Sequence, residues 1–219
     1  MQAPFLPPSW TGWYIGIQGG VVGHDAEYRD LNGFLDGSAG APPHTYSASD
    51  TGGIVGGHAG YNWQAGALVF GIEADISRLW AKVSALAEAP AEPGGRVSFD
   101  IDWLATVRGR FGAVIGQAAL LYVTGGVAFG HVENSAALAP IFNPSQMASD
   151  DTKTGWTIGG GIEYRITHNW TVRAEGRYVD LGDSTATCSP AGITNCAFSY
   201  RGDFSNTLLM GLVGASLRF

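Results

Sequence analysis

The feature that most constrains this chain is an alternation of apolar and polar residues that recurs in about eight segments. The apolar parity carries large side chains such as Trp13, Ile72 and Phe111, and no charged residue belongs to this set. Successive side chains of a strand point to opposite faces, so residues two apart share a face. A charge on a lipid-facing position costs about 2–4 kcal/mol at mid-depth. The pattern therefore predicts strands with one face toward lipid and one toward a polar interior. We expect these strands near residues 11–24, 51–64, 67–80, 97–114, 118–133, 154–166, 169–182 and 204–219.

The C-terminal segment shows the pattern most clearly. Counting back by two from Phe219 to Leu209 meets only apolar residues, and the chain stops on an aromatic side chain. Only helices and closed barrels can span a membrane. No run approaches the roughly 18 apolar residues that a membrane helix needs. We therefore predict an all-β fold: an eight-stranded antiparallel up-and-down transmembrane β-barrel.

Composition agrees with a barrel in one domain of 219 residues. Charged residues make up 14% of the chain, against roughly 25% in a typical soluble domain. A secreted β-sandwich is the alternative, but glycine-rich strands with two distinct faces pack poorly as its core. The formal net charge of −7 and the absence of a basic patch argue against a nucleic-acid partner.

Short and long connections alternate along the chain. The short ones fall at residues 64–66, 115–117 and 167–169, and the long ones at about 25–50, 81–96, 134–153 and 183–203. An up-and-down barrel has this arrangement when one rim faces the periplasm and the other faces outward. We divide the chain into a Pro-rich tether over residues 1–9 and a barrel over 10–219. The tether lacks the basic and apolar regions of a signal peptide.

The polar parity predicts a lumen filled by ion pairs. It carries five acids and five arginines, and buried charges require partners. An eight-stranded barrel has an interior that side chains can fill, so we expect a closed lumen rather than a wide channel. The alternative, acid–base work by neighbouring carboxylates, has less support because the charges balance. The predicted network comprises Glu73, Asp75, Asp102, Arg108, Arg110, Glu163, Arg165, Arg173, Glu175 and Arg177.

The two cysteines and four of the seven tryptophans complete the structural expectations. Cys188 and Cys196 lie close together in a polar segment, which favours one disulfide in an oxidising compartment over two free thiols. Tryptophans gather where a membrane meets water. We expect Trp63 and Trp170, beside short turns, at the periplasmic interface. Trp80 and Trp103 are expected nearer the outer interface.

The histidines give no metal-binding spacing, and we predict no metal or cofactor. His24, His44 and His131 are expected on the loop side, either as solvated loop residues or as an axial haem ligand. The sequence lacks Gly-x-Ser-x-Gly. The residues closest to a catalytic cluster are His131, Glu133 and Ser135, so a lipid-modifying enzyme has little support and we predict no enzymatic activity.

Several motifs together resemble a known family. They include the segments Trp10–Gly16, Gly60–Gln64, Gly71–Asp75 and Thr106–Arg110, and the terminal Leu217–Phe219. They resemble the small porin-like outer-membrane immunogenic proteins of alphaproteobacteria, from Trp10 to Phe219 apart from the long loops. Family members have been linked to envelope integrity, adhesion, immune recognition and, in some, haemin binding. The final aromatic, Phe219, resembles the signal read by the barrel assembly machinery.

The resemblance and the charged lumen together predict a structural outer-membrane barrel without enzymatic activity. Its loops would serve adhesion or ligand contact. A narrow solute channel and a haemin-binding surface protein are the alternatives. The expected partners are outer-membrane lipid and lipopolysaccharide, the assembly machinery during biogenesis, and a surface ligand or neighbouring envelope protein.

Overall fold

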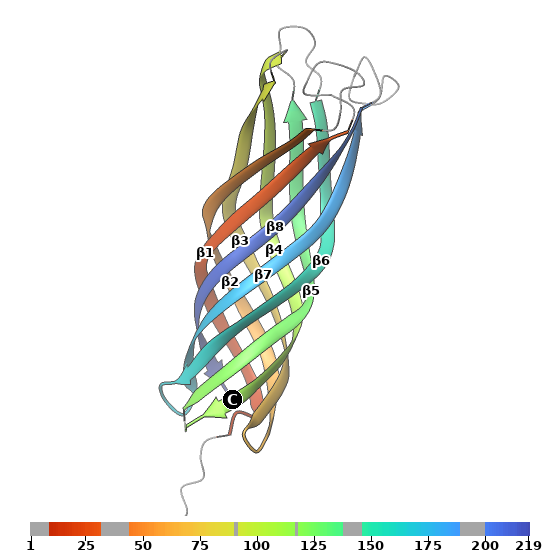
Figure 1. The fold of residues 1–219 in the computed structure, drawn as a ribbon. Helices are drawn as coiled ribbons and strands as arrows, with labels where there is room; N and C mark the ends of the chain where they lie inside the picture. The colour runs from red at the N-terminus through yellow and green to blue at the C-terminus, as the bar shows by residue number, and fades with distance from the viewer. Residues whose placement is uncertain (1–8, 32–43, 90–91, 117, 138–145, 189–199) are drawn as a thin grey trace, which may run out of the picture.

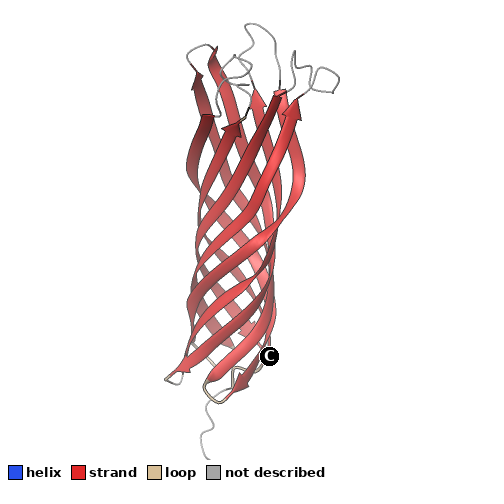
Figure 2. Ribbon diagram, turned by 45° about the vertical axis from the view of Figure 1, so that its right-hand side comes forward, coloured by secondary structure: helices blue, strands red, loops and turns tan. Residues whose placement is uncertain are grey.

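The chain folds as a closed antiparallel barrel in which each strand pairs with its neighbour in sequence and β8 pairs back with β1 (Figure 1). The computed structural model describes residues 9–31, 44–89, 92–116, 118–137, 146–188 and 200–219. These residues are almost entirely strand (Figure 2). The closed sheet confirms the predicted fold class and rules out a two-sheet sandwich.

The strands have the following bounds: β1 Gly12–Asp30, β2 His44–Ala65, β3 Leu68–Ala89, β4 Glu92–Ile115, β5 Ala119–Ala137, β6 Gln146–Arg165, β7 Trp170–Cys188 and β8 Tyr200–Arg218. Over the described ranges, no helix has the length and apolarity required to cross a membrane.

Tight turns join strands at one end of the barrel, where the C-terminus also lies (Figure 1). Gly66 has φ 62° and Gly116 has φ 64°, and glycine adopts this left-handed conformation without steric cost. At the β6–β7 turn, Ile166 and Thr167 both donate backbone hydrogen bonds to the carbonyl of Trp170. The three short connections lie where the sequence predicts them, within about two residues.

The strands are much longer than the sequence predicts. They contain 19–24 residues, whereas about 9–11 suffice to cross a bilayer. Strand structure continues into all four predicted long loops, as in β1, which runs on to Asp30. The reason is visible in β1: Ala26 and Tyr28 remain buried inside, while Asp25 and Glu27 are exposed outside. The alternation therefore continues beyond the lipid-facing region, but with a polar outer face.

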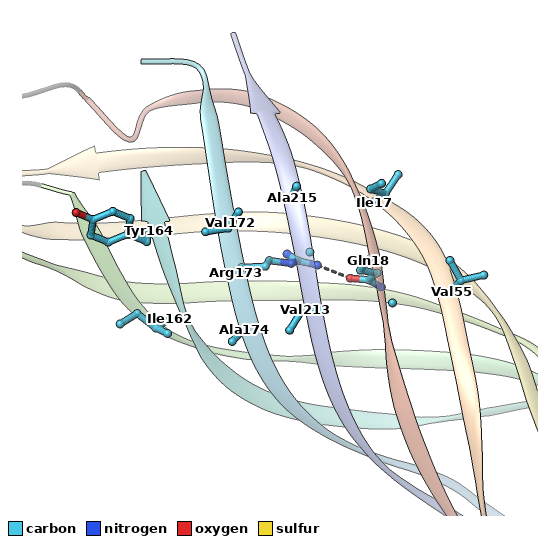
Figure 3. A pocket seen from close by; sticks show the side chains of 12 residues that line it. Ile17, Gln18, Val55, Ile162, Tyr164, Val172, Arg173, Ala174, Val213 and Ala215 are labelled. Atoms are coloured by element: carbon cyan, nitrogen blue, oxygen red, sulfur yellow. Dashed lines mark hydrogen bonds between the residues drawn. The ribbon is translucent and has the colours of Figure 1, made fainter. Parts of the chain in front are cut away.

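The outer wall carries an apolar belt. Its side chains are exposed, with Ile17 at 71% and Trp13 at 62%. Within the belt lies a shallow groove of about 680 Å³, floored by small residues of β7 and β8 such as Ala174 and Ala215 (Figure 3). Arg78 interrupts the apolar wall: it is exposed on β3 and in register with Trp103.

Candidate functional site in the barrel lumen

The predicted lumen charges are buried, with one exception. Nine of the ten are at most 7% exposed, and Asp102 is half-buried elsewhere. They project inward because they alternate with the lipid-facing residues along β3, β4, β6 and β7. Closure of the sheet then brings strands that are distant in sequence around one small interior.

The buried charges form a layer across the lumen, and Arg108 lies at its centre. Its guanidinium lies 2.5 Å from Glu73 Oε1, 2.7 Å from Glu175 Oε1 and 3.2 Å from Asp75 Oδ2. It also donates to Thr124 Oγ1 at 3.0 Å. The planar fork of arginine suits several carboxylates at once. One side chain on β4 thereby ties β3 to β7 across the lumen.

Two arginines of β7 complete the layer. Arg173 Nη1 donates to Glu73 Oε2 at 2.6 Å, and its Nη2 donates to Gln18 (Figure 3). Arg177 lies 2.9 Å from Asp75 Oδ1 and 2.8 Å from Glu175 Oε1. These pairs join β1, β3 and β7 in one network.

Two tyrosines that the sequence analysis did not assign also belong to the network. Tyr14 donates to Glu73 Oε2 at 2.8 Å, and Tyr122 donates to Glu175 Oε2 at 2.9 Å. Glycine makes room for one of these rings, because a Cβ added at Gly161 would lie 2.9 Å from the Tyr122 hydroxyl. The inward glycines therefore make room for rings and neighbouring backbone.

The layer nearest the short turns has an excess of positive charge. Arg110 pairs with Glu163, and Arg218 Nη1 lies 3.6 Å from the other oxygen of Glu163. Arg218 lies in the lumen although the sequence did not predict it there, whereas Asp102, which was predicted in the lumen, lies elsewhere. Among the described residues, the charged network thus contains six arginines and four acids rather than equal numbers, and the further buried acid, Asp30, lies at the other end of β1.

Trp10 closes the lumen at this end. Its ring is fully buried and packs with Val69, Leu120 and Tyr122. The guanidinium of Arg165 lies 4.5 Å from the Trp10 ring centroid, and that of Arg218 lies 5.0 Å from it. Arg165 also donates to Ser9 O at 2.8 Å, and Arg218 donates to Trp10 O. Arg165 and Arg218, the two arginines in excess of the acids, therefore hold the first residues of the barrel domain across this end of the lumen.

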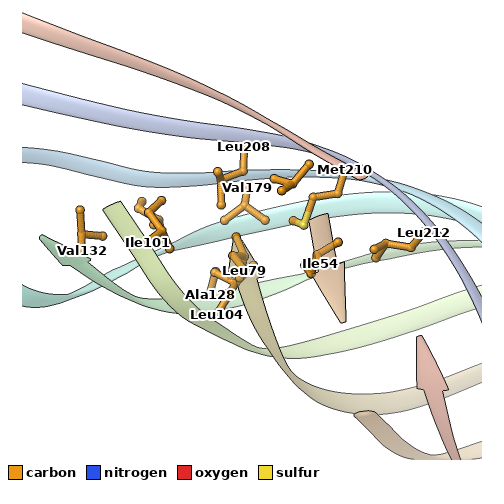
Figure 4. Close-up of a cluster of buried hydrophobic side chains, with 12 residues drawn as sticks. Ile54, Leu79, Ile101, Leu104, Ala128, Val132, Val179, Leu208, Met210 and Leu212 are labelled. Atoms are coloured by element: carbon orange, nitrogen blue, oxygen red, sulfur yellow. The ribbon is translucent and has the colours of Figure 1, made fainter. Parts of the chain in front are cut away.

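An apolar layer fills the lumen on the other side of the charged layer (Figure 4). Its side chains come from seven strands and are at most 3% exposed. The sequence does not reveal this layer, because all of its residues except Ile101 occupy the polar parity of their strands. The layer consists of Val22, Ile54, Leu79, Ile101, Leu104, Ala128, Val132, Val179, Leu181, Leu208, Met210 and Leu212.

Side chains fill the lumen in successive layers along the barrel. Each carboxylate of the central network accepts a hydrogen bond from at least one guanidinium. The apolar layer offers no ligand to a hydrated ion.

Asp102 does not lie in the lumen network, because of a β-bulge. The β4–β5 register shifts between Ile101 and Leu104, and both of these residues are fully buried. A bulge sets two residues opposite one, so the inward parity changes at this point. Ile101, which shares the apolar parity of Phe111 and would therefore face lipid, points inward. Asp102 instead comes close to His131 and Glu133, with their ligand atoms all within 4.8 Å of one another.

His24 also differs from its expected place. It is fully buried inside β1, and its Nε2 lies 3.0 Å from Asn206 Oδ1, so it is not a loop residue. His131 is on the outer wall with a side chain 26% exposed. The side chains of His44 and Ser135 lie outside the described residues.

The remaining predicted features have mixed outcomes. Trp63 and Trp170 are 41% and 50% exposed beside short turns, and Trp80 is 57% exposed. Trp103 is half-buried. Their depth in a membrane stays a prediction. The predicted disulfide falls outside the described residues: the structure describes the backbone of Cys188 but not its side chain, and it does not describe Cys196. Phe219 donates its backbone N–H to Trp13 O at 3.0 Å, and its role as an assembly signal stays a prediction.

A closed barrel with an apolar outer wall is the form in which a β-sheet crosses a membrane. Residues 7–206 match the outer membrane protein beta-barrel domain family. The chain is 36% identical over 194 residues to the 31 kDa outer-membrane immunogenic protein of Brucella melitensis, covering 82% of this chain and 75% of that protein. It is 35% identical over 182 residues to the 22 kDa outer membrane protein of Rhizobium leguminosarum, covering 82% and 68%.

A solved structure supports the same fold. The outer membrane protein OprG from Pseudomonas aeruginosa superposes with a TM-score of 0.61 at 16% identity, covering 95% of this chain and 97% of that one. Such identity shows the fold alone. The chain belongs to the outer-membrane β-barrel domain family, with relatives among the outer-membrane immunogenic proteins, and it is a protein of the bacterial outer membrane.

Proposed function

We propose that this protein is a non-conducting, non-enzymatic structural barrel that presents a surface beyond the outer membrane. The observation that carries the proposal is the filled lumen: Trp10, the charged network around Arg108 and the apolar layer lie one after another along the barrel. The strands that continue past the apolar belt supply the presented surface. A relative's name, outer-membrane immunogenic protein, supports exposure of such a surface.

Conductance tests the closed lumen. Purified barrel inserted into planar bilayers should give no sustained nanosiemens conductance, whereas a water-filled porin inserted by the same protocol should. Sustained channels from the purified barrel would favour the narrow solute channel instead.

Surface presentation needs a separate test. Antibodies raised against the folded barrel should bind intact cells, and deletion of the gene should make cells more sensitive to detergent. Absence of both effects would refute the structural, surface-presenting role.

A saturable shift of the haemin Soret band on adding the barrel would favour haemin binding. Adhesion to a neighbouring protein or host surface belongs to the same proposal, with the strand extensions and outer loops as the contact region.

A further inference from the structure

We propose that Asp102, His131 and Glu133 form a binding site for a divalent transition metal ion, with Zn²⁺ as its best fit, on the outer wall of the barrel. The three residues come from neighbouring strands, β4 and β5. Their ligand atoms lie within 4.8 Å of one another. This inference does not depend on the proposed function of the lumen.

The bulge in β4 creates the cluster. His131 and Glu133 are two residues apart on β5 and therefore share the outer face. The lumen parity of β4, extended from Arg108, would turn Asp102 inward and away from them. The register shift between Ile101 and Leu104 reverses that parity. A structural irregularity thus brings a carboxylate to an imidazole and a second carboxylate.

The spacing of the ligand atoms is compatible with coordination of one ion. His131 Nε2 lies 3.8 Å from Glu133 Oε1, which is too long for a hydrogen bond. Zinc ligands lie about 2.0–2.2 Å from the metal, so neighbouring ligand atoms stand roughly 3–4 Å apart around it. Small rotations of the two side chains would bring both atoms to one ion.

The donor set selects the class of metal. One imidazole nitrogen with carboxylate oxygens is a combination found at zinc sites, and three protein ligands leave a coordination position open. Ca²⁺ and Mg²⁺ prefer oxygen ligands throughout, so the imidazole argues against them. Partial exposure of His131 and Glu133, at 26% and 55%, gives an ion access from outside the barrel.

Two neighbours support the site. The ring of Trp103 lies parallel to that of His131, with an interplanar angle of 5° and 6.4 Å between centroids, which restrains the imidazole plane. Asp100 is in register with Glu133 and adds a further acidic residue beside the cluster. Negative potential at this point attracts a cation.

Zinc titration of the full-length folded barrel tests the proposal. The measurement uses a Cys188→Ser, Cys196→Ser background, so that thiols cannot bind metal, with excess Mg²⁺ present. We expect saturable binding of one Zn²⁺ per chain. Loss of an outer-shell partner alone weakens metal binding by roughly 10–100-fold, so His131→Ala should weaken it at least tenfold. Asp102→Asn and Glu133→Gln should also weaken binding, whereas the turn variant His168→Ala should not.

A spectroscopic measurement reports where the metal binds, independently of how tightly it binds. Co²⁺ bound at the site should quench part of the tryptophan emission, and Trp103→Phe should remove that part without abolishing binding. The proposal is overturned if the folded barrel shows no saturable Zn²⁺ binding, or if His131→Ala binds as the parent does. It is equally overturned if Mg²⁺ or Ca²⁺ displaces Zn²⁺ at comparable concentration, because the site would then be an oxygen site without the imidazole.

Discussion

Glu73 shows how single residues hold the interior together. Its two oxygens accept from Arg108, Arg173 and Tyr14, which come from three different strands. Removing one partner of a buried ion pair leaves the other charge without compensation, and that is usually more costly than replacing the pair. The contribution of such a residue is therefore best measured by deleting it alone.

We expect Glu73→Ala to destabilise the barrel by about 3–5 kcal/mol if the network is dry, and by less if water enters. The fold should persist, because the backbone ladder and apolar layer remain. Denaturant unfolding in lipid vesicles measures the effect. Glu27→Ala, an exposed acid on β1, is the matched control and should change stability by less than about 0.5 kcal/mol. Equal effects of the two variants would contradict the network's role.

The elements are strands longer than a bilayer crossing requires. In β1 the outer face passes from Val21, which is 60% exposed in the apolar belt, to Asp25 and Glu27. Lipid cannot cover charged residues without a large cost. The outer part of the sheet must therefore stand in water, with Tyr28 and Phe204 packed inside it at 4.7 Å between ring centroids.

Cysteine labelling tests where β1 leaves the membrane. With both native cysteines replaced by serine, Asp25→Cys should react rapidly in vesicles with a thiol reagent that cannot enter lipid. Val21→Cys, four residues earlier on the same face, should be protected. Similar labelling of both would place the membrane boundary elsewhere.

The native cysteines provide a second prediction for the outer end of β7. In protein from an oxidising compartment, Cys188 and Cys196 should resist alkylation until a reductant is added. The closed loop is short, so the chain-entropy model limits its effect to about 2–3 kcal/mol. Its place at the end of a strand suggests that barrel stability changes little. Mass spectrometry that finds both thiols alkylated without reduction would refute the disulfide.

The whole molecule has two different ends. Trp10 lies beside a short turn, where its backbone N–H donates to Gln64 Oε1. The short turns and the C-terminus lie at that end of the barrel, and the extended strands lie at the other (Figure 1). Membrane barrels of this class place short turns in the periplasm. We therefore expect Ser47→Cys, on the extended part of β2, to be labelled on intact cells. His168→Cys, in the β6–β7 turn, should be labelled only after lysis, and the reverse result would invert the topology.

The sequence by itself determined the strand count, the short turns and the burial of nine of the ten charges assigned to the lumen. This was possible because side chains of a strand alternate between its two faces and charged side chains are unfavourable in lipid. Both rules are local, so they can be applied to each segment separately. Tertiary structure decided the features that such local rules cannot predict, namely the position of the bulge and the contacts between strands. A single extra residue in β4 reversed the parity of Ile101 and Asp102, and no local pattern marks where a bulge falls. Closure of the sheet decided which charges meet, and it recruited Arg218, Tyr14 and the apolar layer into one interior. Residues from distant strands become neighbours only when the barrel closes, and for that reason the packing of the lumen and the Asp102–His131–Glu133 cluster belong to the fold rather than to any segment.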